Sequence, residues 1–283
     1  QLRGGFIMYQ TYNILNKLKS NYFSLVIIIL LLFSCASPPG GTDLRFEISF
    51  PESVSNELLT GRMLLCFASD DEQEPRLQNT KFGPQFFGVD FENLAPGENV
   101  VIDGSTLGYP VYELKDFPAG EYYIQAVLNK YTEFERSDGH TVWMHNDQWE
   151  GQNWRRSPEN IYSDVQKVAI DPTKGGTISL TVKNIIPPVE VPEETKWVKR
   201  IKFESDLLSE FWGQPIYIGA TILLPKGYDE HPDVYYPTVY QQGHFSLRAP
   251  FRFTEDRENE FYREWTSDDF PRFIAITLQH PTP

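Results

Sequence analysis

The stretch 137–158, "SDGHTVWMHNDQWEGQNWRRSP", gathers an unusual number of side chains that could bind a ligand. It holds three of the six tryptophans and two of the five histidines of the chain, namely His140, Trp143, His145, Trp149 and Trp154. Tryptophan combines a large apolar ring with one polar group, so it can stack on a sugar or pack against a neighbouring domain. We expect a long loop that packs on its own domain or on the next one, with direct ligand binding as the alternative.

The same stretch contains residue types that bind metals. His140, His145 and Asp147 could surround an ion, but their spacing matches no strong zinc pattern. The two cysteines, Cys35 and Cys66, are too few for a cysteine-based zinc site or a disulfide framework. Cys66 lies in the apolar run "RMLLCFA", which is typical of a buried structural thiol. The sequence therefore predicts neither a metal nor a cofactor.

The charge of the chain limits its partners. The 283 residues carry a net charge of −14, and a large nucleic-acid surface is not expected because phosphate binding depends on Lys and Arg. Residues 1–34 hold three basic residues and no acidic one, so the remainder has 22 basic and 39 acidic residues, a net charge of −17. The 40% hydrophobic content is enough to build a buried core.

The N-terminal 34 residues have the pattern of a secretory leader. Lys17 and Lys19 precede the apolar run Tyr22–Phe33, whose 12 residues are short for a membrane span of about 20 residues. The following "L-F-S-C" resembles the bacterial lipoprotein signal, which implies that Cys35 is lipidated and that residues 35–41 form a tether. We therefore expect a bacterial envelope protein that contacts the membrane through Cys35.

Residues 42–186 are expected to form a first, all-β domain. Leu44, Phe46 and Ile48 alternate with polar residues, which indicates a strand with one buried face. Further strands are predicted at 62–68, 85–91, 122–128, 165–170 and 178–182, with turn signals between them. Short strands without long helices predict a β-sandwich of the immunoglobulin type.

A proline-rich linker at 187–196 separates this domain from residues 197–283. In the second part we predict strands at 198–205, 216–225, around 237–245 and at 273–278, with a helix at 255–265 before the last of them. Strands that alternate with a helix in this way are typical of the start of an α/β sheet.

Two segments of this second part resemble a family. "LPKGYD" at 224–229 and "YPTVYQQGHF" at 236–245 are similar to the branch of the α/β-hydrolases that includes enterochelin esterase and esterase D. The resemblance covers about the last third of the chain. It implies a serine esterase that acts on carboxylic esters, with Gly243, His244 and Phe245 in the oxyanion loop. The order here is Gly-His where His-Gly is commoner in the family.

Such an enzyme needs a serine in a G-x-S-x-G turn, followed along the chain by an acid and a histidine. The sequence contains no G-x-S-x-G; Ser246 lies at the oxyanion-loop position, and His280 comes too early to be the catalytic histidine. We expect no catalytic residue in this chain, which we interpret as the leader, one β-sandwich and the N-terminal portion of a hydrolase. The alternative is a non-catalytic surface lipoprotein that binds a carbohydrate or a partner through 137–158.

Overall fold

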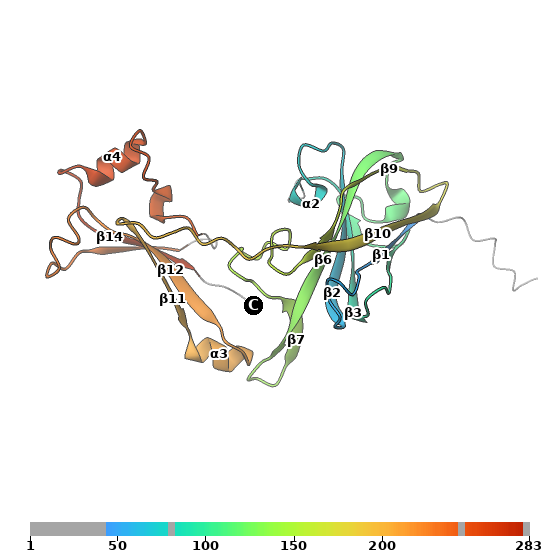
Figure 1. Cartoon of the computed structure of the whole chain (residues 1–283), viewed down its shortest axis with the longest axis horizontal. Helices are drawn as coiled ribbons and strands as arrows, with labels where there is room; N and C mark the ends of the chain where they lie inside the picture. The colour runs from blue at the N-terminus through green and yellow to red at the C-terminus, as the bar shows by residue number, and fades with distance from the viewer. Residues whose placement is uncertain (1–43, 79–82, 243–246, 280–283) are drawn as a thin grey trace, which may run out of the picture. The chain divides into compact units, whose positions relative to one another are not determined.

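The computed structural model describes residues 44–78, 83–242 and 247–279, and the residues from Leu44 onward belong to one compact unit. The described residues form a mostly-β protein with two separate sheets and few helices (Figure 1). The prediction that β-strands dominate the first part is therefore confirmed; the described helices of this part are the short α2 (Pro75–Gln78) and η1 (Leu114–Asp116). Cys35 and the predicted leader lie outside the described residues. Among the described helices, none has the length and apolar character needed to cross a membrane.

The first sheet contains ten strands. Eight of them follow one another in the order β4-β1-β10-β8-β6-β2-β3-β5, while β7 and β9 pair with other parts of β6. The sheet is mixed, because β1 runs parallel to β10 whereas the other neighbours are antiparallel. The strands are β1 (Leu44–Ser49), β2 (Leu59–Ala68), β3 (Phe86–Leu94), β4 (Val100–Ile102), β5 (Gly108–Tyr109), β6 (Gly120–Glu135), β7 (Thr141–His145), β8 (Ile161–Ser163), β9 (Gln166–Ile170) and β10 (Gly176–Ile185).

This sheet curls so that strands far apart in its order share one core. Phe46 of β1 and Phe67 of β2 are separated by three strands in the order, yet their rings meet edge-to-face with centroids 5.9 Å apart. Both side chains are fully buried, and Phe87 of β3 lies against Phe67 at 5.7 Å. The apolar residues that alternate in β1 therefore lie on the concave face of the sheet, where burial of their side chains stabilises the fold.

Strand β6 is much longer than the predicted 122–128. Its first part pairs with β2, β8 and β9, and its last residues, Tyr131–Glu135, pair with β7 (Figure 1). The extension carries polar residues on one side, so it lacks the apolar run by which the first part was recognised. As a result, the start of the tryptophan-rich stretch is a hairpin strand, β7, rather than a loop throughout.

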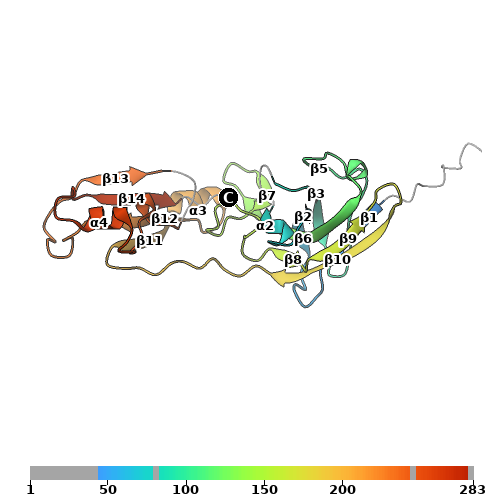
Figure 2. The ribbon, with the colours of Figure 1, turned by 90° about the horizontal axis from the view of Figure 1, so that it is seen from above.

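The second sheet has four strands in the order β11-β12-β14-β13, which Figure 2 shows from above. β11 and β12 are antiparallel, β12 and β14 are antiparallel, and β13 and β14 are parallel. Each predicted strand of this part is present. The strands are β11 (Val198–Glu204), β12 (Tyr217–Leu223), β13 (Thr238–Gln241) and β14 (Ile274–Gln279).

The helices of this part differ from the prediction. The helix expected at 255–265 begins later, as α4 (Glu260–Thr266), because Asp256 accepts the backbone N–H of Glu258 and forms a turn before the N-cap Asn259. A further helix, α3 (Asp206–Trp212), was not predicted. Its ends nevertheless carry ordinary signals, an N-cap serine at Ser205 and a left-handed glycine directly after the last helical residue.

The two faces of the second sheet have different surroundings. On one face, α4 and the short η2 (Pro250–Arg252) pack on Val198, Leu223 and Ala275 to form a second buried cluster around Trp265. The indole N–H of Trp265 donates to the carbonyl of Leu224 at 2.8 Å. The opposite face is apolar and less covered: Ile201 is 47% exposed, Phe203 53% and Tyr240 67%.

Candidate functional site

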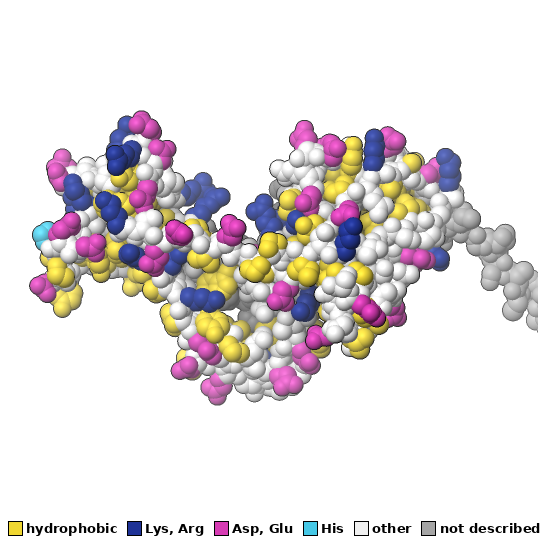
Figure 3. All heavy atoms as spheres, in the orientation of Figure 1, with side chains coloured by type: hydrophobic (Ala, Val, Ile, Leu, Met, Phe, Trp, Pro, Cys, Tyr) yellow, Lys and Arg dark blue, Asp and Glu magenta, His cyan; other side chains and the backbone are white. Residues whose placement is uncertain are grey.

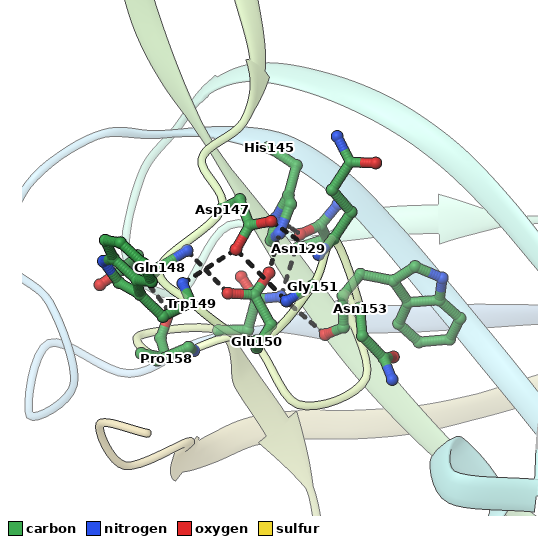
Figure 4. A network of polar contacts seen from close by, with 12 residues as sticks. Asn129, His145, Asp147, Gln148, Trp149, Glu150, Gly151, Asn153 and Pro158 are labelled. Carbon is green, nitrogen blue, oxygen red and sulfur yellow. Dashed lines mark hydrogen bonds and ion pairs between the residues drawn. The ribbon is translucent and has the colours of Figure 1, made fainter. Parts of the chain in front are cut away.

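A compact polar network lies where β7 leads into the loop that follows it (Figure 4). His145, the last residue of β7, faces Asn129 of β6 with Nδ1 and Glu150 of the loop with Nε2, at 2.9 and 2.6 Å. Asn160 donates to the same Asn129 oxygen at 2.9 Å. Asn129 and Asn160 are both buried, so the network is the interior support of the loop rather than part of its surface.

The hydrogen bonds determine how the side-chain amides around His145 are oriented. Asn160 accepts the backbone N–H of Lys130 with Oδ1, so its Nδ2 must be the group that donates to Asn129. The Asn129 oxygen is therefore an acceptor, and the Nδ1 of His145 must donate to it. The other ring nitrogen, Nε2, faces the Oε1 atom of Glu150 at 2.6 Å.

Two carboxylates hold the backbone of this loop. Asp147 accepts the N–H groups of Trp149, Gly151 and Gln152 at 2.9 to 3.3 Å, and Glu150 accepts that of Gln148 at 2.7 Å. Trp149 and Gln152 both have positive φ angles, 76° and 56°, which cost free energy for residues with side chains. The carboxylate bonds offset that cost and keep the loop in one conformation.

The two carboxylates differ in their pKa. Burial, and then repulsion by Glu150, raises the pKa of Asp147 to about 6. Burial also pushes the pKa of Glu150 upward, but hydrogen bonds from His145 and from backbone N–H groups outweigh it and hold this pKa below its ordinary value. A carboxyl group with a raised pKa beside an ionised one is a feature of acid–base sites, although structural networks produce it as well.

Trp149 connects this loop to the second sheet. A Cβ at Gly219 of β12 would lie only 2.8 Å from the indole Cζ3 of Trp149, so the ring packs directly on the glycine backbone. The Nζ of Lys202, which is paired with Gly219 across β11 and β12, lies 4.8 Å from the centroid of the Trp149 ring and 4.7 Å from that of Tyr217. The tryptophan thus makes a packing contact and a cation–π contact with the second sheet.

Two of the predicted residues of 137–158, His140 and Trp143, lie away from this network. His140 is exposed at the β6–β7 turn and faces Asp138, while Trp143 of β7 is 47% exposed. The carbonyl of Trp154 accepts from Asn160, which places that residue at the rim of the network. Of the predicted set, only His145, Trp149 and Trp154 are thus brought together. Across the described part of the chain, no three His, Cys, Asp or Glu residues are grouped as metal ligands.

The family-like segments lie at the ends of the second sheet. Leu224–Asp229 directly follows β12, and the turn includes Gly227 with a φ of 80°. Pro237 accepts the backbone N–H of Ile274, which aligns the start of β13 with β14. The oxyanion-loop candidates Gly243, His244 and Phe245 lie outside the described residues, as do Ser246 and His280.

A row of polar side chains crosses the second sheet and was missed by the sequence reasoning. Arg200 of β11 donates to Thr221 of β12 at 3.0 Å, and Gln279 of β14 donates to the same Thr221 oxygen at 2.9 Å. Thr221 and Gln279 are buried. The sequence did contain a signal for this row. Arg200 lies two residues after the apolar Val198 in β11, so the alternation of the strand places this polar residue on the covered face.

Neither a protein-family model nor a curated protein matches this chain.

Proposed function

We propose that the second sheet is the opening part of the α/β-hydrolase sheet of a serine esterase that hydrolyses carboxylic esters. The order and directions of β11, β12, β14 and β13 carry the proposal. An antiparallel pair that leads into two parallel strands joined by a helix is the start of an open α/β sheet. α4 supplies the crossover between β13 and β14.

The location of the family-like segments supports this proposal. In open α/β sheets, ligands bind beyond the carboxyl ends of the parallel strands. β13 ends at Gln241, and Gly243, His244 and Phe245 follow it in the sequence. Backbone N–H groups there would stabilise the oxyanion of an ester under attack, which is the largest single contribution in this class of reaction.

The uncovered face of the second sheet also fits the proposal. Sheets of this class are covered by helices on both faces, and their strands are apolar on both sides. Ile201, Phe203 and Tyr240 are exposed on the face opposite α4. A hydrolase would cover them with further helices.

The chemistry requires residues that this sequence lacks. A serine in a G-x-S-x-G turn attacks the ester carbonyl, and a histidine takes its proton while an acid orients that histidine. No G-x-S-x-G occurs between Gln1 and Pro283. In the proposal, therefore, the described residues build one side of the site, and the nucleophile comes from elsewhere in the enzyme.

The test has two steps. The coding sequence after Pro283 should contain G-x-S-x-G, then an acid and a histidine, and the longer protein should hydrolyse p-nitrophenyl butyrate until a fluorophosphonate labels its serine. The chain Gln1–Pro283 alone should not exceed the buffer rate. A stop codon directly after Pro283, or fluorophosphonate-sensitive turnover by Gln1–Pro283, would contradict the proposal.

We further propose that the first sheet is an immunoglobulin-like sandwich on a lipoprotein. The facing halves of the curled sheet, with Phe46 packed on Phe67, support the sandwich. The leader pattern before Cys35 supports the lipid anchor. Labelled palmitate should be incorporated into the protein in a bacterial host and be lost in Cys35→Ser; equal labelling of both would refute the anchor.

The alternative, a surface protein that binds carbohydrate through 137–158, is favoured by one observation. Trp143 on β7 is 47% exposed, whereas Trp149 packs against Gly219. If the stretch binds sugar, Trp143→Ala should reduce retention on a glycan column, while Trp212→Ala, outside the stretch, should not. Equal retention of Trp143→Ala and the unmodified protein would count against this function.

A further inference from the structure

Arg200 is a half-buried cation whose guanidinium forms no ion pair within the described residues. The nearby Glu194 accepts the backbone N–H of Arg200 at 2.7 Å and acts on the guanidinium only through its electrostatic field. Its Nη1 donates to the hydroxyl of Thr221 at 3.0 Å and to the carbonyl of Leu247 at 2.7 Å. Its Nε is buried and has no hydrogen-bond partner. Burial lowers the pKa of this guanidinium from its ordinary value, because the charged form loses solvation. A partly desolvated charge whose described hydrogen bonds go only to neutral oxygens is costly to the fold, even with the electrostatic attraction of Glu194.

Several other arginines of the chain do form ion pairs with carboxylates. Four arginines of the first part are paired with carboxylates, in the pairs Arg45–Glu47, Arg62–Asp90, Arg76–Glu74 and Arg136–Asp138. The acidic side chains are scattered over the face seen in Figure 3, so carboxylates are abundant on this protein. The position of Arg200 therefore leaves a charge that a bound anion could neutralise.

Arg200 lines a cleft of about 990 Å³, a volume within the usual range of ligand sites. Apolar walls come from Ile186 and Pro187 after β10, from Val198 and from Phe253. Arg156 and Arg252 also line it, and neither forms an ion pair within the described residues. Exposed glutamates, Glu190, Glu193 and Glu255, share the lining. The preference for an anion therefore arises from the buried guanidinium and not from a general positive field.

We propose that this cleft binds a carboxylate carried on an apolar body, with Arg200 as the group that pairs with the carboxylate. A guanidinium binds a carboxylate through two parallel N–H bonds, and Arg200 uses only Nη1 in its contacts with Thr221 and Leu247. The apolar part of the ligand would lie between Pro187 and Phe253. The site goes beyond the esterase proposal and does not depend on it, because binding requires no nucleophile.

Binding of 2-naphthoate to the full chain, measured by calorimetry, tests this site against the neutral 2-naphthamide. We expect the carboxylate to bind at least about tenfold more tightly than the amide, as a charge-assisted pair requires. Arg200→Gln should reduce naphthoate binding to the level of the amide. Arg257→Gln, an exposed arginine outside the cleft, is the matched control and should bind as the unmodified protein does.

Circular dichroism will show whether Arg200→Gln still folds. If it does not fold, Arg252→Gln serves as the cleft variant instead, since the Arg252 side chain lines the cleft, is exposed and makes no described side-chain contact. A loss of about threefold or more in naphthoate affinity would then support the site. Equal affinities for acid and amide, absence of naphthoate binding, or unchanged binding by the cleft variant would each overturn it. None of these results depends on ester hydrolysis, so failure of this site leaves the esterase proposal untouched.

Discussion

The indole of Trp149 lies on the backbone of Gly219, with a separation that leaves no room for a Cβ at that glycine. Trp149 belongs to a loop held by Asp147 and Glu150, whereas Gly219 belongs to the central part of β12. The contact therefore joins the most constrained loop of the first part to a strand of the second sheet. It requires both a tryptophan in a left-handed conformation and a glycine opposite it.

Gly219→Ala should displace this ring. The added methyl group meets Trp149 and also the Gln279 side chain at 2.9 Å, so we expect a loss of about 1–3 kcal/mol in the free energy of unfolding, measured with urea. Gly104→Ala is the control, because its Cβ would make only an ordinary contact of 3.5 Å with Lys115. Equal stability of the two variants would show that Trp149 does not rest on β12 in solution.

Protonation of Asp147 should make stability depend on pH between the ordinary pKa of 3.8 and the raised value of about 6. Because the folded-state pKa is raised, the protonated carboxyl favours folding. That stabilisation is full below pH 3.8 and is lost as the pH rises through 6. We expect the loss to be about 1–2 kcal/mol once solvent screening of this partly accessible group is included.

Asp147→Asn checks this contribution. The variant loses part of the loop hydrogen bonding at every pH, but it lacks the titration. Its free energy of unfolding, relative to the unmodified protein, should therefore improve by the same amount between about pH 3 and pH 7.5, a range that includes both the ordinary pKa of 3.8 and the raised value of about 6. A difference that stays constant over this range would contradict the raised pKa.

The longer strands of both sheets could be predicted from alternation and apolar runs, because burial of one or both faces leaves a direct trace in the sequence. The short strands β4, β5, β7 and β8 were not predicted, since two to five residues give too little of such a pattern. The polar extension of β6 beyond Leu128 left no such trace, and it is what brings Asn129 beside His145. The His145–Glu150 pair depends on this pairing and on Asn160 from another segment. Sequence reasoning singled out His145 but could not identify its partners.

The helix α3 was also missed. Ser205 carried a cap signal, but two helical turns give too short a periodic pattern to be recognised.

Glu150 has two effects: it contacts His145, and it raises the pKa of Asp147 by repulsion. Glu150→Gln should separate them. Without the carboxylate, the Nε2 of His145 loses its hydrogen-bonding partner in a partly buried position, and the free energy of unfolding should fall by about 1–3 kcal/mol. At the same time the pKa of Asp147 should decrease, since repulsion by Glu150 helps to raise it. Carboxyl chemical shifts recorded over a pH series would show the second effect. A pKa of Asp147 that remains near 6 in the variant would assign the shift to burial alone.

The exposed face of the second sheet can be tested with matched substitutions on its two sides. Phe203 of β11 is 53% exposed, whereas Phe253 packs against Trp265 and is 6% exposed. Phe203→Ser should change the free energy of unfolding by no more than about 0.5 kcal/mol. Phe253→Ser should cost about 3–5 kcal/mol, because it leaves a cavity in the buried cluster.

Binding of an apolar dye is the second measurement on this face. The fluorescence of the bound dye should fall in Phe203→Ser, since such a dye binds an uncovered apolar patch. A large loss of stability in Phe203→Ser, with dye binding unchanged, would mean that this face is covered in solution.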